Sequence, residues 1–198
     1  MKPRWEILEE TTVYRGFFNL LRIRLRHSLF RGGWSRVLTR ELFQRGDCVA
    51  VLPYDPVRDE VVLIEQFRVG ALKHDDPKWM LEIVAGAVEP GESAEAVAHR
   101  ELEEECGCKA MTMTRISEFY TSPGGSSEKI TLFWARVDAG EAGGIHGLEA
   151  EDEDILVHVF PFHEAYGKVE NGEINSAIPI VALQWLALHR DSLLRRGA

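Results

Sequence analysis

The pattern of hydrophobic and polar residues predicts a chain of short strands with few helices. Strict alternation over residues 21–26 predicts a half-buried strand with one arginine face, for which the nearby sequence offers no matching acids. Two glycines at 32–33 predict a turn, and a returning strand is expected over residues 36–44. Further strands are expected at residues 49–54, 60–68, 79–85, 116–121, 130–137 and 155–160, and helices at 162–170 and 176–194.

The remaining segments are predicted to be connections. A turn is expected at residues 55–59, a polar loop at 73–78 and a glycine-rich loop at 139–147. Mixed strands with a few helices for both faces favour an α/β/α sandwich. We expect a small N-terminal antiparallel β unit, residues 1–46, followed by a larger domain at 47–198.

One more helix is predicted between Ser93 and Gly107. Ser93 is a favourable N-cap, the following residues are strong helix formers, and Gly107 ends the run. At 100° per residue, the apolar stripe consists of Ala94, Val97, Ala98 and Leu102. Glu101 and Glu105 fall inside this stripe and Glu104 lies at its edge, whereas Glu95, His99 and Glu103 point to water.

Acids on the apolar face of this helix need compensation. Two glutamates four residues apart repel by roughly 0.2–0.5 kcal/mol, and they crowd the negative end of the helix dipole. Arg100 is the only cation in residues 92–106. Hard divalent cations prefer carboxylate oxygens, so the pattern favours a metal site. The spacing alone is also compatible with a surface helix that carries an accidental acid cluster.

Charge is unevenly distributed along the chain. The net charge of the 198 residues is −9. Residues 1–46 hold ten Lys and Arg against four Asp and Glu, whereas residues 47–198 hold 13 against 28. An acidic body argues against nucleic-acid binding, which depends on neutralising phosphates, but the basic N-terminal part can attract a small phosphorylated ligand.

The sequence also indicates a compartment. No stretch approaches the roughly 18 apolar residues that a membrane helix needs, so we expect no membrane association. The N-terminus lacks the apolar segment of a secretory signal. Three cysteines at positions 48, 106 and 108 have neither zinc nor redox spacing, which favours free thiols in a reducing cytoplasm.

The segment from residue 86 to 108 resembles the signature of the Nudix hydrolases, G-x5-E-x7-R-E-U-x-E-E-x-G-U with U aliphatic. The matching residues are Gly86, Glu92, Arg100, Glu101, Leu102, Glu104, Glu105 and Gly107. Cys108 departs from the pattern at the last aliphatic position, a change expected to affect packing more than chemistry. The resemblance implies the Nudix α/β/α sandwich with the signature as loop–helix–loop.

The same resemblance implies roles for these residues. Glu101 and Glu105 would be metal ligands, with Glu104 as a ligand or close behind one. The backbone carbonyl of Ala85 would be a further ligand. Glu92 and Arg100 would form an ion pair that holds the loop to the helix, and Gly86 would allow a tight approach of the backbone.

Beyond the signature, nearly the whole chain resembles bacterial ADP-ribose pyrophosphatases. The similar stretches include YRGFF, RELFQRG, DPVRDEVVLIEQFR, LEIVAGAVEPGES, SPGGSSE, GIHGL, EDEDI and VALQWLALH. The resemblance implies hydrolysis of ADP-ribose to AMP and ribose 5-phosphate with two or three Mg²⁺, for which Mn²⁺ can substitute. Glu151 would be the general base and Glu153 a metal contact, with Glu153 as the alternative base.

Substrate selection is expected from residues outside the signature. Phe17 is a candidate for stacking on the adenine, Arg40 and Arg68 for binding base or phosphate, and Glu128 for contacting the terminal ribose. Glu41 and Ser122 complete the predicted substrate-binding set. Their strand and loop contexts are equally typical of core aromatic and surface polar residues. The resembled enzymes are homodimers that exchange the N-terminal unit, so we expect a homodimer here.

Two alternative functions remain open at this point. A related Nudix enzyme could act on GDP-mannose or another nucleoside diphosphate sugar. A non-catalytic nucleotide-sugar sensor is the second alternative, but such sensors typically lose the signature glutamates, and Glu101, Glu104 and Glu105 are all present.

Overall fold

The computed structural model describes residues 2–197, which form two compact units. The N-terminal unit combines the chain up to Asp47 with the segment Tyr120–Lys129. The main unit combines Cys48–Phe119 with the chain from Ile130 onward. Two of the predicted substrate-binding residues, Ser122 and Glu128, therefore belong to the N-terminal unit although they lie far from residues 1–46 in sequence.

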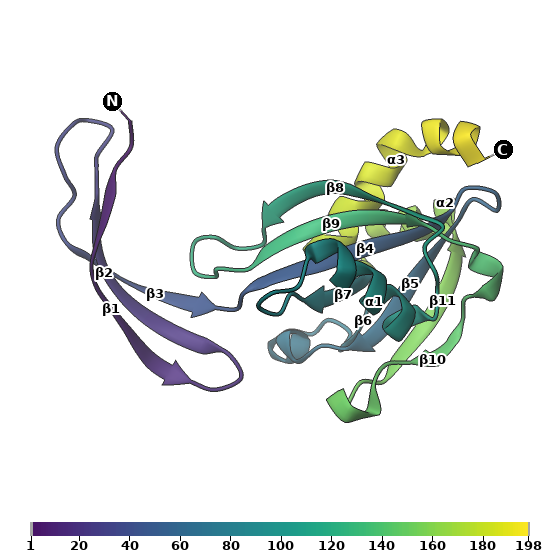
Figure 1. Ribbon diagram of the computed structural model, residues 1–198, viewed down its shortest axis with the longest axis horizontal. Coiled ribbons are helices and arrows are strands. Elements are labelled where there is room, and N and C mark those ends of the chain that lie inside the picture. Colours follow the sequence, from purple (N-terminus) through teal and green to yellow (C-terminus); the bar gives the residue numbers. More distant parts are fainter. Residues whose placement is uncertain (1, 198) are drawn as a thin grey trace. The chain divides into compact units, whose positions relative to one another are not determined.

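The N-terminal unit is an antiparallel sheet of three strands in the order β1-β2-β3 (Figure 1). The strands are β1 (Trp5–Arg15), β2 (Asn19–His27) and β3 (Leu38–Gln44). The sequence did not predict β1. Register shifts between Ile7 and Glu9 and between Thr12 and Tyr14 interrupt its alternation, which hides the strand from a period-two search.

The acids that the arginine face of β2 appeared to lack come from β1. Arg24 pairs with Glu9 at 3.0 Å and Arg26 with Glu6 at 2.7 Å. The sequence near β2 offers no such acids, as expected. Cross-strand pairing supplies them instead, because it brings together residues about 15 to 20 positions apart in sequence.

Within the described residues of the main unit, eight strands form one sheet whose main path is β10-β11-β5-β4-β9-β8. The strands are β4 (Asp47–Asp55), β5 (Glu60–Phe67), β6 (Trp79–Glu82), β7 (Val84–Ala87), β8 (Thr112–Tyr120), β9 (Lys129–Arg136), β10 (Gly144–His146) and β11 (Ile155–Pro161). The helices are α1 (Ala94–Cys106), α2 (Phe162–Glu170) and α3 (Ala177–Gly197), and the short 3-10 turns are η1 (Val69–Lys73), η2 (Ala139–Glu141) and η3 (Glu149–Glu151).

Alternate residues of β4 and β5 feed two separate cores. Val49, Val51, Val62 and Ile64 pack on the face that α1 covers, whereas Ala50, Leu52, Val61 and Leu63 pack on the face that α2 and α3 cover. Both strands are buried on both sides, as expected for the central strands of a sheet between helices. The α/β/α sandwich predicted from the sequence is confirmed (Figure 1).

The structure corrects two local predictions. The single strand expected over residues 79–85 is broken at Ile83 into β6, which pairs with β5, and β7, which pairs with β4. The glycine-rich loop expected over residues 139–147 contains η2 and β10. None of the described helices is long and apolar enough to cross a lipid bilayer.

Candidate active site

Helix α1 begins and ends where the sequence predicted. The side chain of Ser93 accepts a hydrogen bond from the backbone N–H of Ala96 at 3.2 Å. Gly107 adopts a left-handed conformation with φ of 68°, and its N–H donates to the carbonyl of Glu103. Glycine is suited to this C-cap because it has no Cβ to clash in that region. Cys108, the departure from the signature, is buried in the core beneath α1.

The acids predicted to lie on the apolar face of α1 are indeed sheltered. The side chain of Glu101 is 13% exposed, and the whole of Glu105 is 2% exposed. In contrast, Glu95, His99 and Glu103 are exposed. Carboxylates this deeply buried are rare unless an opposite charge or a metal ion compensates them.

Burial and neighbouring acids raise the pKa of both sheltered carboxyls. The pKa of Glu105 rises to about 8, first because it is buried and then because Glu101 and Glu153 lie near it. The pKa of Glu101 rises to about 7, again mainly through burial, with further contributions from Glu104, Glu153 and Glu151. The five acids thus form one electrostatic cluster, in which neighbouring carboxylates oppose the ionisation of Glu101 and Glu105.

Strand β7 runs directly against the acids of α1. The backbone N–H of Ala85 donates to Oε2 of Glu105 at 2.8 Å. A Cβ atom added at Gly86 would lie 2.0 Å from Oε1 of Glu101. The sequence predicted a tight approach at Gly86, and the structure identifies the group that makes glycine necessary there: the carboxylate of Glu101.

Arg100 contacts more acids than the sequence suggested. Its Nη1 lies 2.9 Å from Oε1 of Glu101 and 3.0 Å from Oε2 of Glu104. The predicted ion pair with Glu92 is present but longer, at 3.8 Å. Glu92 also accepts a hydrogen bond from the N–H of Glu89, which closes the loop before the helix. Arg100 therefore supplies positive charge to the acid cluster as well as to the loop.

A second acidic segment meets α1 at its C-terminal end. The N–H of Gly147 donates to the carbonyl of Glu104 at 3.3 Å, one of the carbonyls near the end of the helix. The N–H of Leu148 donates to the carboxylate of Glu153 at 3.3 Å, which folds the loop around η3. Glu151 lies in η3 and is exposed to solvent. The loop thus brings Glu151 and Glu153 to the acids of α1, although about 50 residues separate them in sequence.

The donor chemistry of this cluster fits a hard divalent cation. Its donor atoms are carboxylate oxygens, which hard cations prefer. Two of the carboxyl groups, those of Glu101 and Glu105, have raised pKa values because they are buried and lie near other acids. Between residues 2 and 197, no group of three or more acidic, histidine or cysteine side chains is gathered closely enough to hold a metal ion as it stands. A cation would have to compete with Arg100 for Glu101 and Glu104.

Arg68 follows β5 and lies near enough to Glu105 for its charge to lower the pKa of that carboxyl. Its Nε lies 2.6 Å from Oε2 of Glu82, a contact that the sequence reasoning missed. Gln66 was also missed: it is 8% exposed, and its Nε2 has no hydrogen-bond partner within the described chain. Its place directly after Glu65, at the end of the apolar run 61–64 of β5, was the signal that could have identified it.

The other predicted substrate-binding residues lie in the N-terminal unit. Phe17 is 96% exposed at the turn between β1 and β2. Arg40 and Glu41 lie on β3, where both are exposed. Glu128 is already engaged, because it accepts a hydrogen bond from Thr121 at 2.8 Å and pairs with Arg45 at 2.6 Å. Ser122 begins the turn that carries Glu128, and its carbonyl accepts hydrogen bonds from Gly125 and Ser126.

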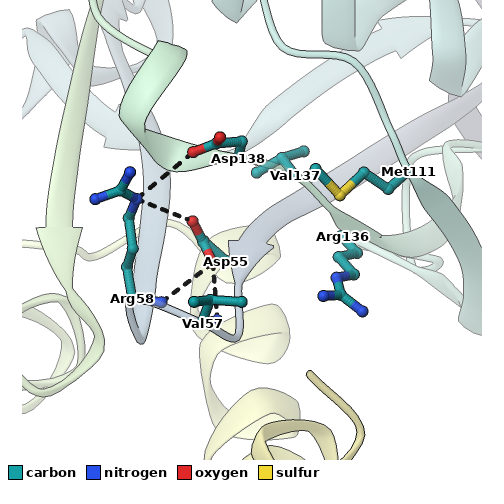
Figure 2. A pocket seen from close by; sticks show the side chains of 7 residues that line it. All are labelled: Asp55, Val57, Arg58, Met111, Arg136, Val137 and Asp138. Atoms are coloured by element: carbon teal, nitrogen blue, oxygen red, sulfur yellow. Dashed lines mark hydrogen bonds and ion pairs between the residues drawn. The ribbon is translucent and has the colours of Figure 1, made fainter. Parts of the chain in front are cut away.

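The main unit also has a pocket of about 310 Å³ that contains none of the predicted site residues. Figure 2 shows Arg58 reaching toward Asp55 and Asp138 on one side of it. Asp55 accepts hydrogen bonds from the N–H groups of Val57, Arg58 and Ala139, so its oxygens stabilise the β4–β5 turn. The acids of this pocket therefore have structural partners, and the candidate active site remains the cluster on α1.

Known proteins with related sequences and structures identify the family of this chain. A family model described as the NUDIX domain matches residues 44–182. The ADP-ribose pyrophosphatase of Escherichia coli (strain K12) is 50% identical over 98% of this chain and 92% of its own. The GDP-mannose pyrophosphatase of Cronobacter sakazakii is 41% identical over 75% of this chain and 78% of its own. The crystal structure of an ADP compounds hydrolase matches with a TM-score of 0.69 and 27% identity, covering 94% of this chain and 95% of that one. The chain therefore belongs to the NUDIX domain family.

Proposed function

We propose that this protein hydrolyses the pyrophosphate bond of ADP-ribose to give AMP and ribose 5-phosphate. The observation that carries the proposal is the extent of the similarity to the ADP-ribose pyrophosphatase of E. coli, which includes the N-terminal unit as well as the Nudix signature. The similarity to the GDP-mannose pyrophosphatase covers a smaller part of the chain. The carboxylates of the acid cluster support the proposal, because they are groups of the kind that such a reaction uses.

The reaction depends on a divalent cation, as membership of this family implies. We propose Mg²⁺, two or three ions per site, with Mn²⁺ as a substitute. Glu101, Glu104, Glu105 and Glu153 and the carbonyl of Ala85 would hold them. When bound, the cations would shield the anionic pyrophosphate, stabilise the charge of the transition state and lower the pKa of a water molecule.

The protein's own groups complete the proposed chemistry. Glu151 takes the proton of the attacking water, because it lies at the edge of the cluster and is exposed to solvent. The water oxygen forms a bond to the adenosyl phosphorus while the bond from that phosphorus to the bridging oxygen breaks. Ribose 5-phosphate leaves and AMP remains, so no covalent intermediate with the protein is formed.

Substrate selection is assigned to the N-terminal unit and to Arg68. We propose that Phe17 stacks on the adenine, that Arg40 binds base or phosphate, and that Arg68 binds phosphate. Glu128 would contact the terminal ribose, and Glu41 and Ser122 would complete the substrate-binding set. The exposure of the Phe17 ring supports its role, since an aromatic ring left in water gains most from a stacking partner.

We also propose that the protein is a homodimer in which the N-terminal units are exchanged, so that Phe17 and Arg40 serve the partner's acid cluster. The support is a small N-terminal unit that exposes large apolar side chains, among them Trp5, Tyr14, Phe17 and Phe30.

The mixed-dimer test combines Phe17→Ala with Arg40→Ala in one chain and Glu105→Gln in the other. After verified subunit exchange, about a quarter of wild-type activity should return. No recovery would contradict the exchange.

The choice of nucleotide sugar is tested by product analysis with Mg²⁺. We expect kcat/KM to be higher for ADP-ribose than for GDP-mannose or nucleoside triphosphates. A higher value for GDP-mannose would replace the proposed substrate, an alternative that the Cronobacter relative favours. Nucleotide binding without turnover of any of these compounds would indicate a sensor. The three cysteines have neither zinc nor redox spacing, which fits a reducing compartment, so we place the enzyme in the cytoplasm.

A further inference from the structure

We propose that Glu82 is a positioning residue that orients the guanidinium of Arg68 toward the substrate's pyrophosphate. The inference rests on the proposed function, because it takes Arg68 as the phosphate-binding group. Glu82 lies outside the Nudix signature. It ends β6, the strand that was expected to be continuous with β7.

The sheet brings the two side chains together from opposite strands. Strand β6 pairs antiparallel with β5, with Ile64 opposite Glu82 and Phe67 opposite Trp79. The N–H of Arg68 then donates to the carbonyl of Lys78 at 2.7 Å, which continues the pairing by one residue. Arg68 and Glu82 are therefore offset along the strands, and their side chains must run toward each other to make the 2.6 Å contact.

Both oxygens of Glu82 are engaged. Oε2 accepts from Nε of Arg68, and Oε1 accepts from the hydroxyl of Ser176 at 3.1 Å. Ser176 directly precedes α3, so the carboxylate is held between a strand and the start of a helix. A carboxylate whose two oxygens are both hydrogen-bonded is held in one orientation. Its hydrogen bond to Nε then holds the guanidinium of Arg68 in one orientation as well.

The contact leaves the useful end of Arg68 available. A guanidinium has five N–H donors, and Glu82 uses the one on Nε. The other four N–H donors belong to the two terminal nitrogens. These two nitrogens can bind a phosphate group in a bidentate manner. The Glu82 side chain is 15% exposed whereas that of Arg68 is 39% exposed, so the anchor is sheltered and the arginine reaches outward.

Arg68 is also near enough to Glu105 for its charge to act on that carboxylate. A positive group beside the acid cluster attracts phosphate to an otherwise negative surface. Its orientation matters because an arginine that turned fully onto the acids would neutralise them and lose its contact with the substrate. The anchor at Glu82 opposes this rotation.

The test measures steady-state kinetics with ADP-ribose and Mg²⁺ for Glu82→Gln, Arg68→Lys and the double variant. Glutamine keeps the size of the side chain but removes the charge that holds Nε. We expect KM to rise about tenfold in Glu82→Gln, with kcat within about twofold of wild type, the size of one lost charged hydrogen bond. The double variant should be little worse than Arg68→Lys, because the two residues act as one unit.

A matched control removes a different ion pair of the main unit. Glu173→Gln breaks the exposed ion pair between Glu173 and Lys168. Neither residue of this pair belongs to the proposed site. We expect its KM to be unchanged. Ser176→Ala should show a smaller rise in KM than Glu82→Gln, since it releases only one of the two oxygens that fix the carboxylate.

The outcomes separate the inference from the function on which it rests. A normal KM in Glu82→Gln, together with a raised KM in Arg68→Lys, would overturn the positioning role alone. Fully multiplicative effects in the double variant would also overturn it, as would an equal rise in KM for Glu173→Gln. A wild-type protein that does not hydrolyse ADP-ribose would overturn the proposed function and this inference with it.

Discussion

The substitution Gly86→Ala adds a single methyl group at the point where β7 meets the acids of α1. The new Cβ would lie 2.0 Å from Oε1, 2.1 Å from Cδ and 2.4 Å from Cγ of Glu101. Ordinary contacts to a Cβ begin at 3.4 Å. The carboxylate must therefore move by more than about 1 Å, since carbon and oxygen atoms cannot interpenetrate at these separations. Gly86 does not have a positive φ, so the backbone itself accepts alanine.

The expected consequence falls on activity more than on stability. A metal site tolerates changes in ligand distance of about 0.2 Å, several times less than this displacement. Misplacing a catalytic group by about 1 Å can cost on the order of 100-fold in rate. We therefore expect kcat/KM for ADP-ribose to fall at least about 100-fold, with a higher Mg²⁺ concentration needed for half-maximal activity. The flexible Glu101 side chain can rotate away, so the free energy of unfolding should change by less than about 1–2 kcal/mol.

The assay combines AMP release over a range of Mg²⁺ concentrations with thermal unfolding in a chelator. Gly167→Ala is the matched control, because it adds the same methyl group inside α2 with no atom within 4 Å. It should stabilise the protein by about 0.5–1 kcal/mol and leave kcat/KM unchanged. Activity of Gly86→Ala within a few fold of wild type would refute the reasoning, and so would an equal loss in Gly167→Ala.

Three further predictions concern charge. In a chelator, the Glu105 carboxyl with its pKa of about 8 stabilises the folded state while protonated, below about pH 4.5, and this stability is lost as the pH rises through 8. Between these pH values the free energy of unfolding should fall less in Glu105→Gln than in wild type, by on the order of a few kcal/mol. The same dependence of the unfolding free energy on pH in both proteins would contradict this. Glu151→Gln should lower kcat at every Mg²⁺ concentration with nearly normal substrate affinity, whereas recovery at high Mg²⁺ would make Glu151 a ligand and leave Glu153 as the base. Arg190 donates from Nε to Asp59 at 2.7 Å, so Arg190→Ala should cost about 1–3 kcal/mol in unfolding experiments and spare activity; lost activity at full stability would disprove a structural role.

Much of the candidate site could be predicted because it lies on one helix. The spacing of Glu101 and Glu105 places both on one face of α1 whatever the rest of the chain does. The apolar residues on the same face of α1 have to pack against the sheet. This packing buries the two glutamates as well. In contrast, the partners of Arg68 and of the arginines on β2 could not be predicted. Those contacts depend on strand register, which is set by pairing across the sheet.

The sequence by itself determined the elements whose signals are local. Helix α1 has both of its boundaries written in single residues, Ser93 and Gly107, because capping involves groups within one turn of the helix end. Only the tertiary structure decided that residues 79–87 form two strands with different neighbours, and that Gly147 joins the η3 loop to the end of α1. These features depend on hydrogen bonds between backbone groups that are distant in sequence. Because nearly every residue has the same backbone N–H and C=O groups, the side-chain pattern does not predict which of them pair.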